Sequence, residues 1–268
     1  MENKKIAILG GGNLGVAIAL GLTGSGTSKA GDIMITRRNL SKLDSIQSAG
    51  FVLTSDNEAA VKQAHIVILC VQPKQLDELI DSIRGILDPE KHILVSTITG
   101  ITIAEIESML NTPMPLIRAM PNTSIAIGKS MTCMCASNAD ALQIKEIETL
   151  FNSLGITLTI EERHMKAATV LAASGIAFFM RYLRAATQGG IQLGFDAEES
   201  QLIAVQTALG AASSILEKNS HPELEIDKVT TPEGCTIAGL NEMEHQGFSS
   251  ALIKGLVTSY DKINNIKK

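Results

Sequence analysis

The 268 residues, of which 45% are hydrophobic and 19% charged, have the composition of an ordinary globular protein with room for one large or two medium domains. This composition excludes a disordered or fibrous chain. A formal net charge of −5 at pH 7, without any run of lysine or arginine, argues against a surface built for nucleic acid or for an anionic membrane. We therefore expect the partners to be a small-molecule substrate and further copies of the same chain.

The N-terminal residues lead straight into an apolar run without the features of a signal peptide, so we expect a cytoplasmic protein. The longest apolar stretch, residues 167–180, is too short to cross a bilayer and predicts a core helix. No paired C-x-x-C spacing is present, so we expect no bound metal and a reducing compartment. The four cysteines are Cys70, Cys133, Cys135 and Cys235.

Along the first part of the chain, short β-branched runs alternate with segments of helical periodicity. The expected strands are residues 6–9, 32–36, 51–53, 66–71, 93–97, 116–120, 131–135 and 156–160. The expected helical segments are residues 17–22, 40–48, 58–63, 75–87, 103–110 and 139–153. This alternation predicts an α/β domain over residues 1–162, a Rossmann-type, mostly parallel sheet with helices on both faces.

The pattern changes after residue 162, where no convincing strand follows. Residues 167–190 are small or apolar nearly all the way round, and a second apolar series repeats at helical spacing. That series is Leu202, Val205, Leu209, Ala212 and Leu216. About four such helices cannot cover one another, so residues 163–268 are predicted to form an all-α dimerisation domain interwoven with a second copy. A homodimer, or a higher homo-oligomer built of dimers, follows; the alternative is a helical lobe packed only on its own sheet domain.

A glycine pattern stands at the first strand-to-helix turn. Gly10-x-Gly12-x-x-Gly15 follows the first expected strand and opens the first helix. Backbone N–H groups and the helix dipole at such a turn suit a pyrophosphate, so the pattern predicts a dinucleotide site. The alternative is a tight glycine-rich turn without a ligand.

The end of the second strand indicates which dinucleotide binds. An acidic residue there would favour NAD, whereas this chain has Arg37 and Arg38. Guanidinium groups suit a 2′-phosphate through charge-assisted contacts, so NADPH is expected, with NADH as the weaker alternative. The other interpretation is a pair of solvated surface arginines.

The stretch "TTPEGCT" is unusual for a helix start. With Thr231 as N-cap and Pro232 as the first helical residue, Gly234 becomes the third, where glycine costs about 1 kcal/mol relative to alanine. Glycine suits a position that another group must approach closely. The free N–H groups of Gly234, Cys235 and Thr236 are therefore expected to face an anion, such as a substrate carboxylate.

Six motifs follow one another over nearly the whole chain, namely "ILGGGNLGVAIALGL", "ILCVQPKQL", "VSTITGI", "IRAMPNTSIAIGKSMT", "TVLAASGIAFF" and "VTTPEGCTIAGLNEME". In this order they resemble the pyrroline-5-carboxylate reductase family. The resemblance implies reduction of the cyclic imine 1-pyrroline-5-carboxylate to L-proline with hydride from NADPH, the last step of proline biosynthesis. A protonated imine needs orientation more than a strong acid, which fits a turn without an obvious catalytic group.

The resemblance also implies site residues. For the cofactor these are Gly10, Gly12, Asn13 and Leu14 under the pyrophosphate, Arg37 and Arg38 at the 2′-phosphate, Asn57 at the adenosine, and Val71, Gln72, Pro73 and Asn122 at the nicotinamide half. For the substrate they are Val229, Thr231, Gly234, Cys235 and Thr236. The Thr236 hydroxyl, beside the ring nitrogen, is the expected catalytic group.

The chain departs from the family pattern at several positions. Glu233 replaces a glycine, Ile176 a proline, Gln72 a lysine, Ser124 a proline and Ser130 a glycine. These positions concern the substrate side more than the fold, so they leave the exact substrate and rate open.

Two other functions are considered. A β-hydroxyacid dehydrogenase shares the domain order but needs a Lys-x-x-Asn pair, where this chain has Lys166-x-x-Thr169. A non-catalytic dinucleotide-binding paralogue would be compatible with the departures from the family pattern.

Overall fold

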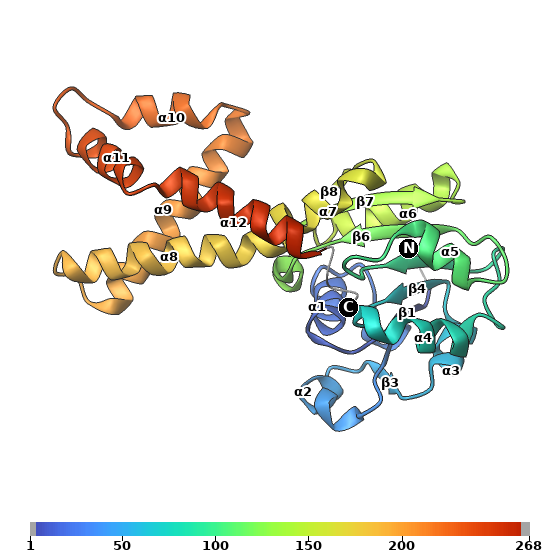
Figure 1. Ribbon diagram of the computed structural model, residues 1–268. Coiled ribbons are helices and arrows are strands. Elements are labelled where there is room, and N and C mark those ends of the chain that lie inside the picture. Colours follow the sequence, from blue (N-terminus) through green and yellow to red (C-terminus); the bar gives the residue numbers. More distant parts are fainter. Residues whose placement is uncertain (1–3, 264–268) are drawn as a thin grey trace. The chain divides into compact units, whose positions relative to one another are not determined.

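A computed structural model describes residues 4–263 and divides the chain into two compact units (Figure 1). One unit takes in the residues up to Ser174 and again those from Ser259, and the other is Gly175–Thr258. The predicted boundary after residue 162 falls inside the first unit. Met165, only 1% exposed, packs into the core beside the sheet, so the chain stays with that unit beyond residue 162.

The first unit is built on one eight-stranded sheet in the order β3-β2-β1-β4-β5-β6-β7-β8. Its strands are β1 Ile6–Leu9, β2 Ile33–Thr36, β3 Val52–Thr54, β4 Ile66–Leu69, β5 Ile93–Ser96, β6 Leu116–Met120, β7 Ser130–Ser137 and β8 Gly155–Thr159. All neighbours pair in parallel except β6 and β7, which are antiparallel. The predicted mostly parallel sheet is confirmed. The strand order reverses between β1 and β4, and ligands of such sheets bind at the carboxyl ends of the strands at this point.

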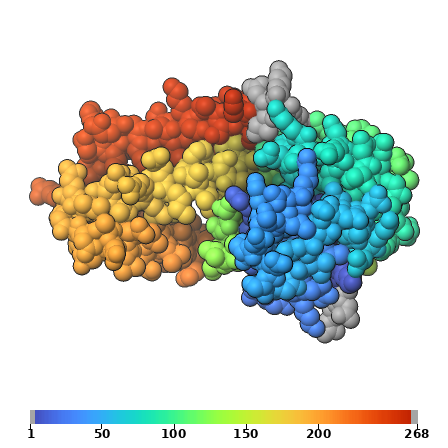
Figure 2. All heavy atoms as spheres, turned by 90° about the horizontal axis from the view of Figure 1, so that it is seen from below, coloured from blue at the N-terminus to red at the C-terminus, as the bar shows by residue number. Residues whose placement is uncertain are grey.

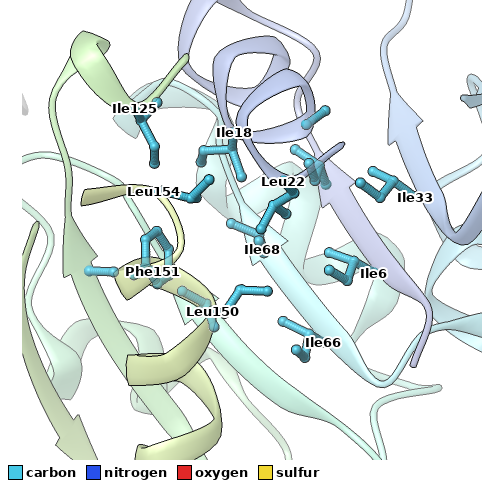
Figure 3. Close-up of a cluster of buried hydrophobic side chains, with 14 of the residues drawn as sticks. Ile6, Ile18, Leu22, Ile33, Ile66, Ile68, Ile125, Leu150, Phe151 and Leu154 are labelled. Atoms are coloured by element: carbon cyan, nitrogen blue, oxygen red, sulfur yellow. The ribbon is translucent and has the colours of Figure 1, made fainter. Parts of the chain in front are cut away.

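Helices cover both faces of the sheet. They are α1 Asn13–Gly24, α2 Asp44–Gln47, α3 Asn57–Gln63, α4 Leu76–Ile83, α5 Ile103–Met109, α6 Ala141–Asn152 and α7 Met165–Ala168. Alternate strand residues feed two separate cores, because successive side chains of a strand point to opposite faces. Ile6 and Ile68 join Ile18 and Phe151 on one face (Figure 3). Leu9 joins the helices of the opposite face. Strands buried on both faces explain the nearly continuous β-branched runs of the sequence.

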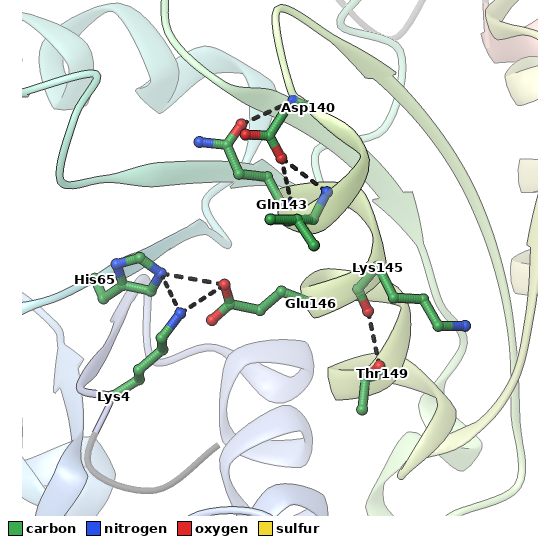
Figure 4. A network of polar contacts seen from close by, with 8 residues as sticks. Lys4, His65, Asp140, Gln143, Lys145, Glu146 and Thr149 are labelled. Carbon is green, nitrogen blue, oxygen red and sulfur yellow. Dashed lines mark hydrogen bonds and ion pairs between the residues drawn. The ribbon is translucent and has the colours of Figure 1, made fainter.

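Polar contacts fix the ends of several elements in this unit. The Asp140 carboxylate accepts from the N–H groups of Leu142 and Gln143, and caps α6 (Figure 4). Glu146 of the same helix pairs with Lys4 at 2.7 Å, which attaches the start of the chain to α6. These contacts are structural and lie away from the switch point between β1 and β4.

The second unit contains helices only, as predicted for this part of the chain. The helices are α8 Gly175–Gln192, α9 Ala197–Lys218, α10 Pro222–Val229, α11 Cys235–His245 and α12 Phe248–Ile263, whose last residues belong to the first unit. Helices α8 and α9 run side by side (Figure 2), and the Ser200 hydroxyl donates to the Thr187 carbonyl across them at 2.7 Å.

The apolar series predicted on α9 lies on the surface of the single chain. Leu202 is 70% exposed, Leu209 56% and Leu216 71%. The predicted core helix over residues 167–180 is also corrected for the single chain: Thr169 and Val170 of the π-helical segment Thr169–Ser174 are buried, but Leu171, Phe179 and Met180 are exposed. The second unit therefore lacks the cover that its apolar side chains need.

Within residues 4–263, none of the helices is long and apolar enough to cross a membrane.

Candidate functional site

The glycine turn after β1 has the geometry of a close backbone approach. Gly10 has a φ of 117°, a conformation that other residues rarely adopt. A Cβ at Gly10 would collide with the carbonyl of Cys70 at the end of β4, and one at Gly15 would collide with the Gly10 carbonyl. Nothing lies within 4 Å of the corresponding position at Gly12, which leaves open space directly before α1. The turn is thus shaped by its glycines and open at the N-terminus of α1, where an anion binds favourably.

A cavity of about 590 Å³ lies at this turn, at the carboxyl ends of β1, β2 and β4. It brings together most of the residues predicted to bind the cofactor, namely Gly10, Gly12, Arg37, Arg38, Asn57, Val71 and Gln72. Residues that sequence reasoning did not select also line it, among them Asn39, Lys42, Ser55, Gln75, Glu78 and Ser82. A dinucleotide fits the position of the cavity in the fold and its glycine turn.

The basic end of the cavity is formed where β2 ends. The Arg37 guanidinium donates to the Gly11 carbonyl at 2.5 Å, which holds this side chain against the glycine turn. Arg38 pairs with Glu78 of α4, with 3.3 Å between Nη2 and Oε2. Lys42 adds a third cation to the same lining. A phosphate would therefore meet mainly positive charge here.

Four predicted cofactor residues do not line the cavity: Asn13, Leu14, Pro73 and Asn122. Leu14, at the start of α1, packs against the core that α1 covers. Asn122 is 7% exposed, and its side-chain amide donates to the Ala172 carbonyl of the π-helical segment at 3.3 Å. Its side-chain oxygen accepts from the Ser124 N–H, so Asn122 makes structural contacts on both sides.

The cavity wall contains the Cys70 thiol, whose environment favours the protonated form. Burial raises the pKa of Cys70 to about 12, and the hydrogen bond to Thr97 lowers it less. The Thr97 hydroxyl also donates to the Leu69 carbonyl at 2.9 Å, and it lies 3.1 Å from the Cys70 Sγ, where either atom can be the donor. Among residues 4–263, no three metal-ligating side chains gather either.

The predicted substrate turn belongs to the second unit and differs from the expected helix start. Helix α11 begins at Cys235 with Gly234 as its N-cap, so Pro232 and Gly234 are not its first and third residues. Glu233 has a φ of 58°, a left-handed conformation that interrupts the helix and closes a turn. The Gly234 N–H donates to the Thr231 carbonyl at 3.0 Å.

The geometry of this turn explains why residue 234 is a glycine, and it changes which N–H groups are free to bind an anion. A Cβ at Gly234 would lie 2.5 Å from the Thr231 hydroxyl oxygen and 2.9 Å from its carbonyl oxygen. Because the Gly234 N–H is used within the turn, the helix-start donors are those of Cys235, Thr236 and Ile237. Val229, Thr231 and Cys235 are exposed and Thr236 is half-buried, so this surface is open in the single chain.

A second cavity in the first unit holds charged groups that pair with one another. Arg118, 5% exposed, contacts Glu162 at 2.7 Å, and Glu162 also accepts from the Ile103 N–H. Lys166, the residue considered for a β-hydroxyacid dehydrogenase, stacks over the Tyr260 ring at 3.5 Å. It does not line the cavity at the glycine turn.

The fold and the cavity at the switch point define the class of a dinucleotide-dependent oxidoreductase. The family model described as "NADP oxidoreductase coenzyme F420-dependent" matches residues 5–100, and that described as "Pyrroline-5-carboxylate reductase dimerisation" matches residues 162–266.

Relatives and solved structures agree on the family. The chain is 49% identical to pyrroline-5-carboxylate reductase 1 of Dictyostelium discoideum over 98% of its own length and 50% of that protein's. It is 45% identical to pyrroline-5-carboxylate reductase 2 of the same organism, covering 97% of this chain and 92% of that one. A pyrroline-5-carboxylate reductase structure from Coxiella burnetii matches with a TM-score of 0.88 at 28% identity over all of both chains. The chain belongs to the pyrroline-5-carboxylate reductase family, and it spans about half the length of the first of these relatives.

The structure of Plasmodium falciparum pyrroline carboxylate reductase with NADP bound has the same fold, with a TM-score of 0.91 at 22% identity over all of both chains.

Proposed function

We propose that this protein reduces 1-pyrroline-5-carboxylate to L-proline with hydride from NADPH, the last step of proline biosynthesis. The observation that carries the proposal is the cavity at the switch point, which joins the glycine turn to Arg37, Arg38 and Lys42. Membership of the pyrroline-5-carboxylate reductase family supports pyrroline-5-carboxylate as the substrate. The NADP named for the structurally similar Plasmodium protein is consistent with the cofactor.

The residues of the first unit fit a dinucleotide. The open space at Gly12 and the N-terminus of α1 accept the pyrophosphate, with Asn13 and Leu14 contributing backbone groups. Arg37 and Arg38 hold the 2′-phosphate by charge-assisted hydrogen bonds, and Asn57 contacts the adenosine side. The residues assigned to the nicotinamide half are Val71, Gln72, Pro73 and Asn122. When bound, NADPH supplies the hydride that the chain's own side chains cannot supply.

The residues of the second unit fit a small carboxylate. In this proposal the N–H groups of Cys235, Thr236 and Ile237 bind it at the start of α11, and Gly234 keeps the turn in shape. The Thr236 hydroxyl orients the imine nitrogen as the catalytic residue. Val229 and Thr231 border the ring, and the Glu233 carboxylate must point away from a bound anion.

The test is NADPH oxidation by the purified full chain with chemically prepared pyrroline-5-carboxylate, followed by detection of proline. Proline that forms only with both substrates present supports the proposal. Oxidation of a β-hydroxyacid with NADP instead, or tight NADPH binding without turnover of the imine, would replace it with one of the two alternatives. The stacking of Lys166 on Tyr260 gives the first alternative no structural support.

We further propose that the helical unit forms a homodimer and that any higher homo-oligomer is built of such dimers. The exposed leucines of α9 supply the apolar surface, and the dimerisation model matches the same part of the chain. Light scattering over a dilution series tests the assembly.

All four cysteines are free thiols, which supports the expectation of a reducing compartment such as the cytoplasm.

A further inference from the structure

The basic end of the dinucleotide cavity contains one carboxylate, that of Glu78. Gln75, Glu78, Leu79 and Ser82 all line this cavity, because their spacing places them on one face of the segment that leads into and through α4. The second strand offers only arginines at the position where a dinucleotide enzyme carries an acidic residue for the ribose. Glu78 brings an acidic group to the same place from another element.

The three cations beside Glu78 are not equivalent. Arg37 is held by the Gly11 carbonyl, and no ion-pair partner of Lys42 is found among the described residues. Arg38 alone is shared with Glu78, at 3.3 Å. The Arg38 and Glu78 side chains are 71% and 73% exposed, and exposed pairs are weak. The pair can therefore open at little cost when a competing anion arrives.

We propose that Glu78 is a specificity-determining residue of the cofactor site: it competes with the 2′-phosphate of NADPH for Arg38, and it accepts a hydrogen bond from the 2′-hydroxyl of NADH. This inference rests on the proposed function, because it assumes that a nicotinamide dinucleotide occupies the cavity. A phosphate must displace Glu78 from Arg38 and lies near its negative charge. A bare ribose finds in Glu78 the carboxylate that the end of β2 lacks. Glu78 thus reduces the difference between the affinities for NADPH and NADH that the cations create.

The experiment measures the dissociation constants of NADPH and NADH by calorimetry on the full chain, for the wild type and for Glu78→Gln. The ratio of the NADH constant to the NADPH constant should rise about three- to tenfold in the variant, as expected for an exposed charge pair and one ribose hydrogen bond. NADPH should bind more tightly and NADH more weakly.

Asp81→Asn is the matched control. Asp81 lies one turn further along α4, pairs with Arg84 at 3.3 Å and does not line the cavity. The Asp81→Asn substitution removes the same charge from the same helix. The ratio of its NADH and NADPH dissociation constants should therefore stay within about twofold of the wild type. An equal rise in both variants, or an unchanged ratio in Glu78→Gln, would overturn the inference.

The proposed function and the inference fail differently. A wild-type chain that binds neither dinucleotide refutes both. A wild-type chain that binds NADPH and reduces pyrroline-5-carboxylate, with a Glu78→Gln ratio equal to its own, refutes the role of Glu78 alone.

Discussion

The two units of this chain solve the burial of apolar side chains in opposite ways. In the sheet unit, strands β1, β2, β4 and β5 are buried along their whole length by the chain's own helices. In the helical unit, large apolar side chains such as Leu202, Leu209 and Phe248 remain exposed in the single chain. A unit that carries its own core folds around itself, whereas a unit that exposes this much apolar surface has the property of an interface, which agrees with the proposed homodimer.

Breaking the helical unit's surface gives the largest expected effect. Leu209→Glu would place an unpaired charge in the proposed interface, where it costs several kcal/mol, and should abolish the dimer. Leu142→Glu makes the same change at an 81% exposed leucine of α6 in the sheet unit and should leave the dimer intact. Light scattering of both variants checks this. A Leu209→Glu protein that remains dimeric, or a wild type that is an active monomer, would contradict the proposed assembly.

The substrate turn is the next point of attack. Gly234→Val should abolish turnover, because its side chain meets the Thr231 hydroxyl and carbonyl oxygens and opens the turn before α11. NADPH binding to the sheet unit should persist. Gly239→Ala is the control, since nothing lies within 4 Å of its Cβ and alanine favours a helix interior by about 1 kcal/mol. Turnover with pyrroline-5-carboxylate and NADPH binding are measured for both. Normal turnover by the valine variant would show that the carboxylate binds elsewhere.

The sheet unit could be predicted well because its signals are local. Each strand overlaps its predicted range, and β1, β2, β4 and β5 are the apolar, largely β-branched runs that the prediction used. The glycines around Gly10 stand at a turn whose backbone geometry requires them. Such features depend on neighbours in the sequence, so periodicity and residue type are enough to find them.

The rest depends on long-range contacts that sequence patterns do not carry. Glu78 reaches the cofactor cavity only because α4 lies beside the end of β2 in space. Asn122 contacts the Ala172 carbonyl fifty residues away in the chain, which no local pattern indicates. The Thr-Pro-Glu-Gly stretch predicts a helix start because Thr and Pro are typical of the first positions of a helix, whereas the left-handed Glu233 delays α11 to Cys235.

Cofactor selection tests whether the sheet unit's cations act on the 2′-phosphate. Replacing Arg37 and Arg38 together with glutamine should raise the Michaelis constant for NADPH about tenfold or more and change that for NADH little, because charge-assisted contacts to the phosphate are lost. Lys29→Gln, outside the cavity lining, is the control. Steady-state kinetics with both dinucleotides measure the effect. Equal changes for NADPH and NADH would show that the arginines do not contact the 2′-phosphate.

The Thr236 hydroxyl tests the chemistry of the helical unit more gently. Thr236→Ala removes one side-chain hydrogen bond and leaves the backbone donors of α11 in place, so kcat should fall about fivefold without vanishing. Thr258→Ala, the same change at an exposed threonine of α12, should retain activity. Initial rates at saturating NADPH compare the two. An unchanged kcat in the alanine variant would remove Thr236 from the reaction.

The smallest expected effect concerns the strain at Glu233. Its φ of 58° places a residue with a Cβ in the left-handed region, at a cost of about 1 kcal/mol that glycine does not pay. Glu233→Gly should therefore raise the free energy of unfolding of the helical unit by up to that amount. The rise is smaller where the greater freedom of glycine in the unfolded chain offsets the relief of strain. Asn219, with a φ of 47° at the end of α9, is the natural comparison, because asparagine tolerates this conformation and Asn219→Gly should gain less. Urea unfolding of both variants, with proline binding measured alongside, separates stability from function. If the Glu233 carboxylate also faces the bound anion, proline should bind more tightly to Glu233→Gly at neutral pH, because the substitution removes a like charge. A Glu233→Gly protein less stable than the wild type would contradict the prediction that relief of the backbone strain at Glu233 is the dominant effect.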